Sequence, residues 1–242
     1  MKEIDDEDEE EKEKEIKIEE KIEEDPLPPK PQKKTKTDLK IIIVGDSGTG
    51  KTSLINRYIL NKFSETYSPT ISSQFNYKIL KKDDVFYRLN FWDIAGQDRN
   101  PTVTGVFCKD VNGIILCCEV NKVSTRENTI KWKKSIEGNI NIDGIPIIIV
   151  ENKCDLLGKD EQSYNKNIDD LKKFYEDNNL NKAFRVSALN GYGIENAMNF
   201  LIDEIIGNNE KKRNSINLNS RTSIVLNKEV SIRKRKKKCC DS

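Results

Sequence analysis

The chain has 242 residues and a net charge of +1, because 42 Lys and Arg residues nearly balance 41 Asp and Glu residues. It carries six cysteines without zinc-type CxxC pairs and no histidine, which argues against a Cys/His metal site. The longest apolar runs are too short to cross a bilayer, and the acidic N-terminus does not resemble a secretory signal. We therefore expect a cytosolic chain with reduced thiols.

The near-neutral total hides three regions of different charge. Residues 1–38 carry 9 basic and 16 acidic residues, a balance of −7, and residues 39–206 carry 22 of each. Residues 207–242 carry 11 basic and 3 acidic residues, a balance of +8. A dense run of like charges predicts disorder in the first region, which ends in a Pro-rich linker. The last region shows no sustained hydrophobic periodicity, so we expect it to be flexible as well. We therefore predict one domain at 39–206 between an acidic arm and a flexible basic tail.

Within this domain, short apolar runs alternate with amphipathic patterns. Strands are predicted at 39–44, 85–92, 113–120, 145–150 and 183–186, and helices near 51–60, 124–138, 167–178 and 191–206. Residues 75–92 form two alternating runs joined by KKDD, which is typical of an antiparallel hairpin. We predict a doubly wound α/β domain with a mostly parallel six-stranded sheet, one antiparallel strand, and helices on both faces. Ligands of such domains bind at the carboxyl ends of the strands.

The sequence GDSGTGKT, Gly45 to Thr52, follows the first strand and fits the phosphate-loop pattern GxxxxGK[ST]. Glycines let successive backbone N–H groups face inward and cradle anionic oxygens, and a helix N-terminus adds its positive dipole end. Lys51 should neutralise the β and γ phosphates, and the Thr52 hydroxyl should hold Mg²⁺. The alternative is a Gly-rich turn with a chance lysine. The residues expected to bind phosphate are Asp46, Ser47, Gly48, Thr49, Gly50, Lys51, Thr52 and Ser53.

The sequence NKCD, Asn152 to Asp155, follows the strand predicted at 145–150. The Asp155 carboxylate can accept hydrogen bonds from guanine N1–H and the N2 amino group together, whereas adenine has no such pair of donors. The alternative is a polar turn without a role in binding. Because the motif lies at the carboxyl end of a strand downstream of a phosphate loop, it favours a guanine nucleotide.

Two further segments suit the γ-phosphate and its metal. In WDIAGQ, Asp93 suits an outer-sphere Mg²⁺ role, Gly96 can offer its N–H to the γ-phosphate, and Gln97 can orient an attacking water. In YSPTI, the Thr70 hydroxyl can complete the metal shell when a γ-phosphate is present. Taken singly, Thr52 and Thr70 are ordinary cap or surface residues, and only the motifs around them indicate a metal.

Together these motifs resemble the small GTPases of the Ras superfamily, specifically the Rab family. GDSGTGKT, FSETYSPTI, WDIAGQD, NKCD and SAL occur in the family's order, and the match covers residues 39–206. The resemblance implies bound GTP or GDP with Mg²⁺, and Lys51, Thr70 and Gln97 in catalysis. It places Phe63 and Lys153 on the two faces of the guanine and the Ala188 N–H at its carbonyl. The remaining implied contacts are Tyr67, Gly96, Asn152, Asp155, Ser187 and Leu189.

The resemblance also implies a surface for effectors. Phe75, Trp92 and Phe107 match the aromatic positions that Rab proteins present to effectors, although without the resemblance they would be ordinary buried residues. WDIAGQ together with KWK, residues 131–133, is similar to the Rab subgroup that serves lysosome-related organelles. Residues 72–74 and 98–101 depart from the usual pattern, so the resemblance does not identify the effectors or the activator.

The implied function is a GTP-hydrolysing switch in vesicle traffic, with an exchange factor, an activating protein and effectors as partners. The motifs place no arginine over the phosphates, so an activator would supply one and unaided hydrolysis should be slow. Two alternatives stay open. One is a nuclear-type small GTPase whose basic tail serves import or nucleic-acid binding. The other is a GTP-gated binding module with little hydrolysis, which the altered segment GQDRNP suggests.

The chain ends in RKRKKKCCDS, with six consecutive basic residues before Cys239 and Cys240. Such a run is normally a solvated charge cluster or a nucleic-acid patch. The two adjacent cysteines instead resemble the doubly prenylated terminus of Rab proteins, and lipid plus basic charge is what stable anchoring needs. We expect lipidation by the prenylation machinery, location on the cytosolic face of an anionic endomembrane, and no DNA partner.

Overall fold

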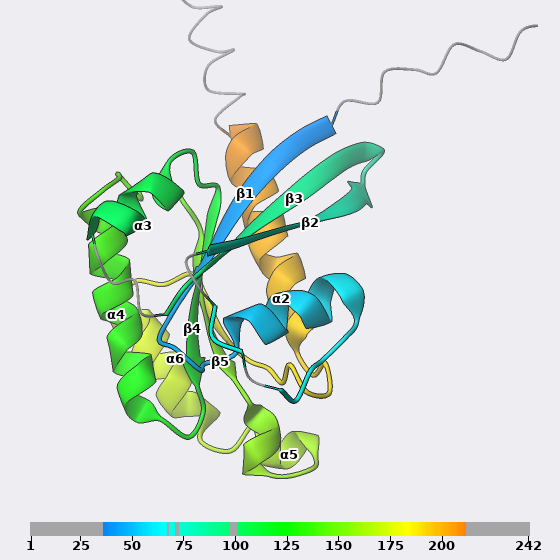
Figure 1. Cartoon of the computed structure of the whole chain (residues 1–242), viewed down its shortest axis with the longest axis vertical. Coiled ribbons are helices and arrows are strands. Elements are labelled where there is room, and N and C mark those ends of the chain that lie inside the picture. Colours follow the sequence, from blue (N-terminus) through cyan, green and yellow to red (C-terminus); the bar gives the residue numbers. More distant parts are fainter. Residues whose placement is uncertain (1–35, 67, 71–72, 97–100, 212–242) are drawn as a thin grey trace, which may run out of the picture. The chain divides into compact units, whose positions relative to one another are not determined.

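The structure is a computed structural model that describes residues 36–66, 68–70, 73–96 and 101–211. Helices separate most of the strands along the chain, and one pair of strands forms a hairpin, as Figure 1 shows. The first half contains β1 (Lys36–Val44), α2 (Lys51–Leu60), β2 (Ser73–Lys82), β3 (Val85–Ile94), α3 (Pro101–Cys108) and β4 (Gly113–Glu119). The second half contains α4 (Val123–Glu137), β5 (Ile147–Asn152), the 3₁₀ turn η1 (Cys154–Leu157), α5 (Glu161–Tyr164), α6 (Ile168–Asp177), β6 (Lys182–Arg185) and a C-terminal helix over residues 194–211.

The strands form one six-stranded sheet in the order β2-β3-β1-β4-β5-β6. β1 pairs in parallel with β3 and β4, and β4, β5 and β6 continue the parallel arrangement. Only β2 runs antiparallel, beside β3, as the alternating pattern of residues 75–92 predicts. The predicted doubly wound fold is confirmed. Its parallel strands end on one edge of the sheet, and the motif-bearing loops follow these ends.

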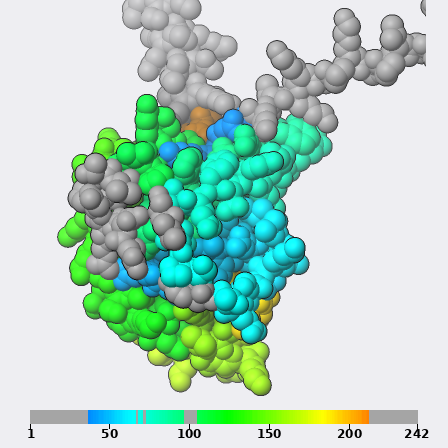
Figure 2. Space-filling view, in the orientation of Figure 1, coloured from blue at the N-terminus to red at the C-terminus, as the bar shows by residue number. Residues whose placement is uncertain are grey.

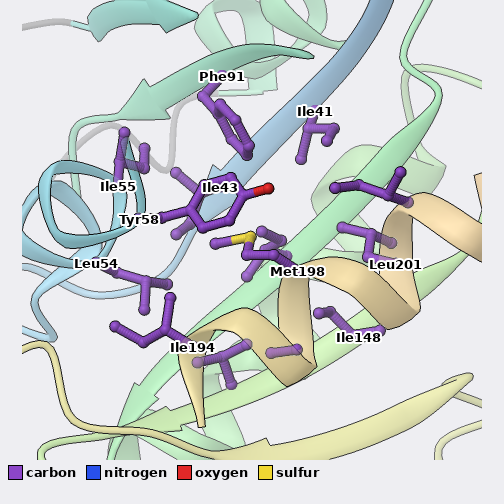
Figure 3. Packing of buried hydrophobic residues seen from close by; sticks show 14 of the residues in the cluster. Ile41, Ile43, Leu54, Ile55, Tyr58, Phe91, Ile148, Ile194, Met198 and Leu201 are labelled. Carbon is purple, nitrogen blue, oxygen red and sulfur yellow. The ribbon is translucent and has the colours of Figure 1, made fainter. Parts of the chain in front are cut away.

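Helices cover both faces because the strands are apolar on both sides. Alternate residues of β1 point to opposite faces, so Ile41 and Ile43 join one core cluster and Ile42 and Val44 join the other. The first cluster is covered by α2 and the C-terminal helix; Figure 3 shows Leu54 and Tyr58 of α2 meeting Met198 and Leu201 of that helix over β1. The second cluster is covered by α3, α4 and α6, which lie on the other side of the sheet (Figure 1).

The sequence patterns miss two short helices. α3 begins at Pro101, where a proline suits the first helical position, but it is only eight residues long and shows too little periodicity to be predicted. α5 is a single turn that begins after Asp160, whose side chain accepts from the Ser163 N–H. In the described part of the chain, no helix is both long enough and apolar enough to cross a membrane.

Four cysteines are free thiols buried in the core: Cys108, Cys117, Cys118 and Cys154. Burial raises the pKa of Cys108, Cys117 and Cys154 to about 11, and it raises the pKa of Cys118 well above its usual value. These thiols therefore hold little reactive thiolate near neutral pH, and they serve as small apolar core residues.

We predict that only Cys239 and Cys240 react rapidly with a thiol reagent at pH 8 in protein made without lipid. A pKa of about 11 instead of 9 lowers the thiolate fraction about 100-fold, and burial excludes the reagent as well. The measurement is a count of modified thiols before and after unfolding in urea. A Cys239→Ser/Cys240→Ser variant should show no rapid phase, and a third rapidly reacting thiol in the native chain would contradict the buried core.

Candidate functional site

A cavity of about 690 Å³ opens where the loops after β1, β3, β5 and β6 meet. Figure 2 views the molecule from the side on which α2 and the segment after it, in cyan, reach the surface. The cavity brings together predicted residues from positions 47 to 189 of the chain. These are Ser47, Gly48, Gly50, Lys51, Thr52, Ser53, Phe63, Thr70, Gly96, Asn152, Lys153, Asp155, Ala188 and Leu189.

At one end of the cavity, the backbone of the loop after β1 surrounds the Lys51 side chain and accepts its hydrogen bonds. The Lys51 ammonium donates to the backbone oxygens of Gly45 (2.9 Å) and Asp46 (3.1 Å), and the side chain is buried. Gly50 has φ +88°, which favours glycine, and a Cβ there would overlap the amide nitrogen of Asn152. α2 begins at the next residue, so its N–H groups and a positive charge converge on one spot. This arrangement suits anionic oxygens.

Three oxygen-bearing side chains meet beside this loop. The hydroxyls of Thr52 and Thr70 lie 3.0 Å apart, and the Thr52 hydroxyl donates to Oδ2 of Asp93. Oδ1 of Asp93 is buried and, among the described residues, has no hydrogen-bond partner. Burial raises the pKa of Asp93, while the hydrogen bond from Thr52 and the charge of Lys51 oppose that rise. An orphaned carboxylate oxygen beside two hydroxyls fits a hard divalent cation such as Mg²⁺.

At the other end, the side-chain amide of Asn152 joins two loops. Its nitrogen donates to the backbone oxygen of Thr49 (2.9 Å), and its oxygen accepts from the Ala188 N–H (3.1 Å). Asp155 accepts a hydrogen bond from the Ser187 hydroxyl and still lines the cavity. This contact leaves further acceptor positions on the Asp155 carboxylate, as recognition of a pair of donors requires.

Two basic residues brace this end of the cavity. Arg57 of α2 donates to the backbone oxygens of Ala188 (2.9 Å) and Leu189, so the helix that begins at Lys51 holds the loop at the other end of the cavity. Lys153 has φ +66°, and its ammonium donates to Oε2 of Glu119 (2.8 Å). The sequence patterns assign no role to Arg57 or Glu119, because their contacts join segments far apart in the chain.

A buried group of charges lies under the loop that begins at Asn152. Glu151 is fully buried; it accepts from Arg126 Nε of α4 (3.0 Å) and Arg185 Nε of β6 (2.7 Å). Arg185 also donates to the backbone oxygens of Tyr164 (3.0 Å) and Lys166. Buried charges are costly unless paired and hydrogen-bonded. Here the pairing fixes α4, β6 and the α5 segment around the last residues of β5.

Several predicted site residues lie elsewhere. Asp46, Thr49 and Ser187 do not line the cavity but support residues that do. Tyr67 and Gln97 lie outside the described residues. Residues of α2, of the segment after it and of β2 that were given no role of their own also line the cavity: Asn56, Leu60, Lys62, Ser64, Glu65, Thr66, Ser68, Pro69 and Gln74. Their only signal in the sequence is their position around Phe63 and Thr70.

The three aromatic residues expected to face effectors form one row across separate elements. The ring centroids of Phe75 and Trp92 are 5.2 Å apart, and those of Trp92 and Phe107 are 5.7 Å apart. Phe75 is 46% exposed, and the next outward residues of β2, Tyr77 and Ile79, are exposed as well. The structure therefore brings these side chains together at the surface beside α3.

Comparison with known proteins identifies relatives of this arrangement. The Ras family model, described as "Ras family", matches residues 40–207. Ras-related protein Rab-32A of Dictyostelium discoideum is 38% identical over 182 residues, which cover 73% of this chain and 82% of the relative. Human Ras-related protein Rab-32 is 32% identical over 205 residues, 83% of this chain and 88% of the relative. Human Ras-related protein Rab-7L1 is 30% identical over 173 residues, which cover 70% of this chain and 83% of the relative.

We predict that Glu151→Ala lowers the free energy of unfolding by about 3–5 kcal/mol, because the buried guanidinium of Arg185 loses its counter-charge. Urea unfolding followed by circular dichroism measures this loss. The control is Lys81→Ala, which breaks the exposed pair with Asp84 and should leave stability unchanged. A loss for Glu151→Ala no larger than for the control would show that the buried charges do not support the fold.

Proposed function

The chain belongs to the Ras family of small GTPases and is a Rab protein, a GTP-hydrolysing switch in membrane trafficking, and from that premise we propose how its cavity binds guanine nucleotide. The relatives are those of the subgroup that WDIAGQ and KWK indicate, and they favour the Rab interpretation over a nuclear-type GTPase. The observation that carries the proposal is the placement of Asn152, which holds the phosphate loop and the loop at Ala188 around one cavity.

The phosphates bind at the loop of residues 45–52. Lys51 exchanges its hydrogen bonds to two backbone oxygens for the β and γ phosphates. The N–H groups of the loop and of the first turn of α2 donate to the remaining oxygens. The 3.0 Å contact between Thr52 and Thr70 supports the expectation that Thr70 reaches the γ-phosphate end.

The guanine binds between Phe63 and Lys153. Phe63 lines the cavity and is 37% exposed, so its ring is accessible to a flat ligand. The stem of Lys153 covers the other face while its ammonium stays on Glu119. Asp155 accepts from the two donors of the guanine edge, and the Ala188 N–H, which donates to Asn152 in the structure, shares its hydrogen with the guanine carbonyl when nucleotide binds.

A magnesium ion fits at Thr52, Thr70 and Asp93. When bound, it would neutralise charge that develops on the phosphates during hydrolysis. Thr52 and Thr70 offer hydroxyl oxygens, and the unpartnered Oδ1 of Asp93 takes a water or the ion itself. Their mutual contacts keep the three side chains in place around that position.

Switching depends on the segments that carry Thr70 and Gly96. Both line the cavity at the phosphate end, so loss of the γ-phosphate removes contacts from two loops at once. Among the described residues, none that lines the cavity is an arginine. An activating protein therefore supplies one, with a rate gain of roughly 10³–10⁵-fold, and unaided turnover is slow. Gln97 orients the attacking water, and Phe75, Trp92 and Phe107 receive effectors.

The tail attaches the protein to a membrane. Cys239 and Cys240 carry prenyl groups, and the six basic residues before them add attraction to an anionic cytosolic leaflet, about 1 kcal/mol each. The organelle is a lysosome-related one if the subgroup's role extends to this chain. An exchange factor and the prenylation machinery complete the set of partners.

We predict that the purified chain prefers GTP over ATP by at least about 1,000-fold in affinity. The Asp155 carboxylate accepts from two donors of guanine, and adenine, which lacks this pair, would leave it unpaired. Asp155→Asn should weaken GTP binding and favour xanthosine triphosphate, since the new amide can donate to the oxygen that xanthine carries at C2. The measurement is displacement of a fluorescent GDP analogue, with Mg²⁺ present or chelated. Asp169→Asn, an exposed carboxylate away from the cavity, should bind as the parent chain does, and equal affinity for GTP and ATP would refute the base assignment.

We also predict that Cys239→Ser/Cys240→Ser moves the protein from the membrane fraction to the soluble fraction of a eukaryotic cell. Two prenyl groups bind a bilayer stably, whereas the basic residues alone do not. Fractionation and mass spectrometry of the intact chain measure the distribution and the added lipid. Asp241→Asn should keep the membrane location. Two free terminal thiols in protein from such cells would rule out the lipid anchor.

A further inference from the structure

The carboxylate of Asp46 is held by two side chains of α4. Trp132 Nε1 donates to Oδ1 of Asp46 (3.1 Å), and Asn128 Nδ2 donates to Oδ2 (2.6 Å). The two donors are four residues apart, so they project from one face of the helix on successive turns. Asp46 is the second residue of the phosphate loop, yet it is absent from the residues that line the cavity. Its charge is directed toward α4, away from the expected phosphates.

The backbone of Asp46 is central to the phosphate loop. Its carbonyl oxygen accepts from Lys51 Nζ (3.1 Å) and from the Thr49 hydroxyl (2.9 Å). Gly96 lies against the peptide that joins Asp46 to Ser47, because a Cβ on Gly96 would overlap the backbone nitrogen of Ser47. A displacement of Asp46 would therefore disturb the lysine, the loop and the segment that carries Gly96 together.

The helix that holds Asp46 is itself fixed. Trp132 is 1% exposed and packs in the core with Ile42 and Val44 of β1 and Ile94 of β3. Its indole cannot turn without opening the core, so the N–H stays aimed at Asp46. A carboxylate free to rotate in this loop would repel bound phosphates, because like charges a few ångströms apart interact strongly outside bulk water.

We propose that Asn128 and Trp132 are positioning residues that keep the Asp46 charge away from bound phosphates and thereby slow nucleotide release. This inference rests on the proposed nucleotide site. Neither residue lines the cavity, so both act through Asp46. In the sequence, Trp132 stands out only as part of KWK, and only the fold reveals the contact between its indole nitrogen and Asp46.

The test is the rate at which the full chain releases a fluorescent GDP analogue in Mg²⁺, followed by stopped flow. Asn128→Leu removes both amide donors at similar size, and Trp132→Phe removes the indole N–H. Each should release GDP about 10-fold faster than the parent, since a hydrogen bond to a charged group is lost. In an Asp46→Ala background the same substitutions should give no further acceleration. Binding of guanosine, which has no phosphate, should not change.

Lys133→Met is the matched control. It removes the neighbouring hydrogen bond of α4 to the Asn178 carbonyl (3.2 Å), on a different face of the helix, and should leave the release rate unchanged. If Asn128→Leu and Trp132→Phe release GDP at the parent rate, the inference is wrong while the proposed function stands. It is also wrong if they accelerate release equally without Asp46, because they then act through packing. If the parent chain fails to bind GDP, the proposed function fails and the inference with it.

Discussion

The buried amide of Asn152 is the contact on which the site depends. Its two ends engage the backbone of the phosphate loop and the backbone at Ala188, so the loops that follow three parallel strands are held in a fixed relation. A parallel sheet brings these loops to one edge, but it does not determine their separation. A side chain with one donor group and one acceptor, both satisfied by backbone, does determine it. The cavity between the loops is a consequence of that connection.

Negative charge near the site is controlled by partners within the protein. Asp46 is bound by α4, Asp93 by Thr52, and Glu119 by Lys153 and Lys122. Burial alone would raise the pKa of Glu119, but the hydrogen bonds from the two lysines lower it below its usual value. Each of these three carboxylates is held by at least one donor of the protein, which reduces their repulsion of an anion at this end of the sheet.

The sequence was sufficient to predict the sheet, the antiparallel hairpin and α2. The spacing of apolar residues and the phosphate-loop motif are both signals that can be read within a short stretch of chain. It also placed Lys51, Thr52, Asn152 and Asp155 in one site, since each follows a predicted strand. It could not predict α3, whose eight residues show little periodicity. Nor could it predict the charges around Glu151, which follows an apolar run. Its partners, Arg126 and Arg185, come from α4 and β6, and only the packing of these elements brings them together.

The chain contains two tryptophans, and the structure places them at different depths. Trp132 lies in the core with its indole nitrogen on the phosphate loop, whereas Trp92 is half-buried between Phe75 and Phe107, where it packs against the same core cluster from outside. The protein therefore carries two natural optical probes. Emission from the first is sensitive to the position of the Asp46 carboxylate, and emission from the second is sensitive to what contacts Phe75 and Phe107. A Trp92→Phe variant keeps the contact of Trp132 and leaves its emission as the single indole signal, so the state of this loop can be followed in the unlabelled protein.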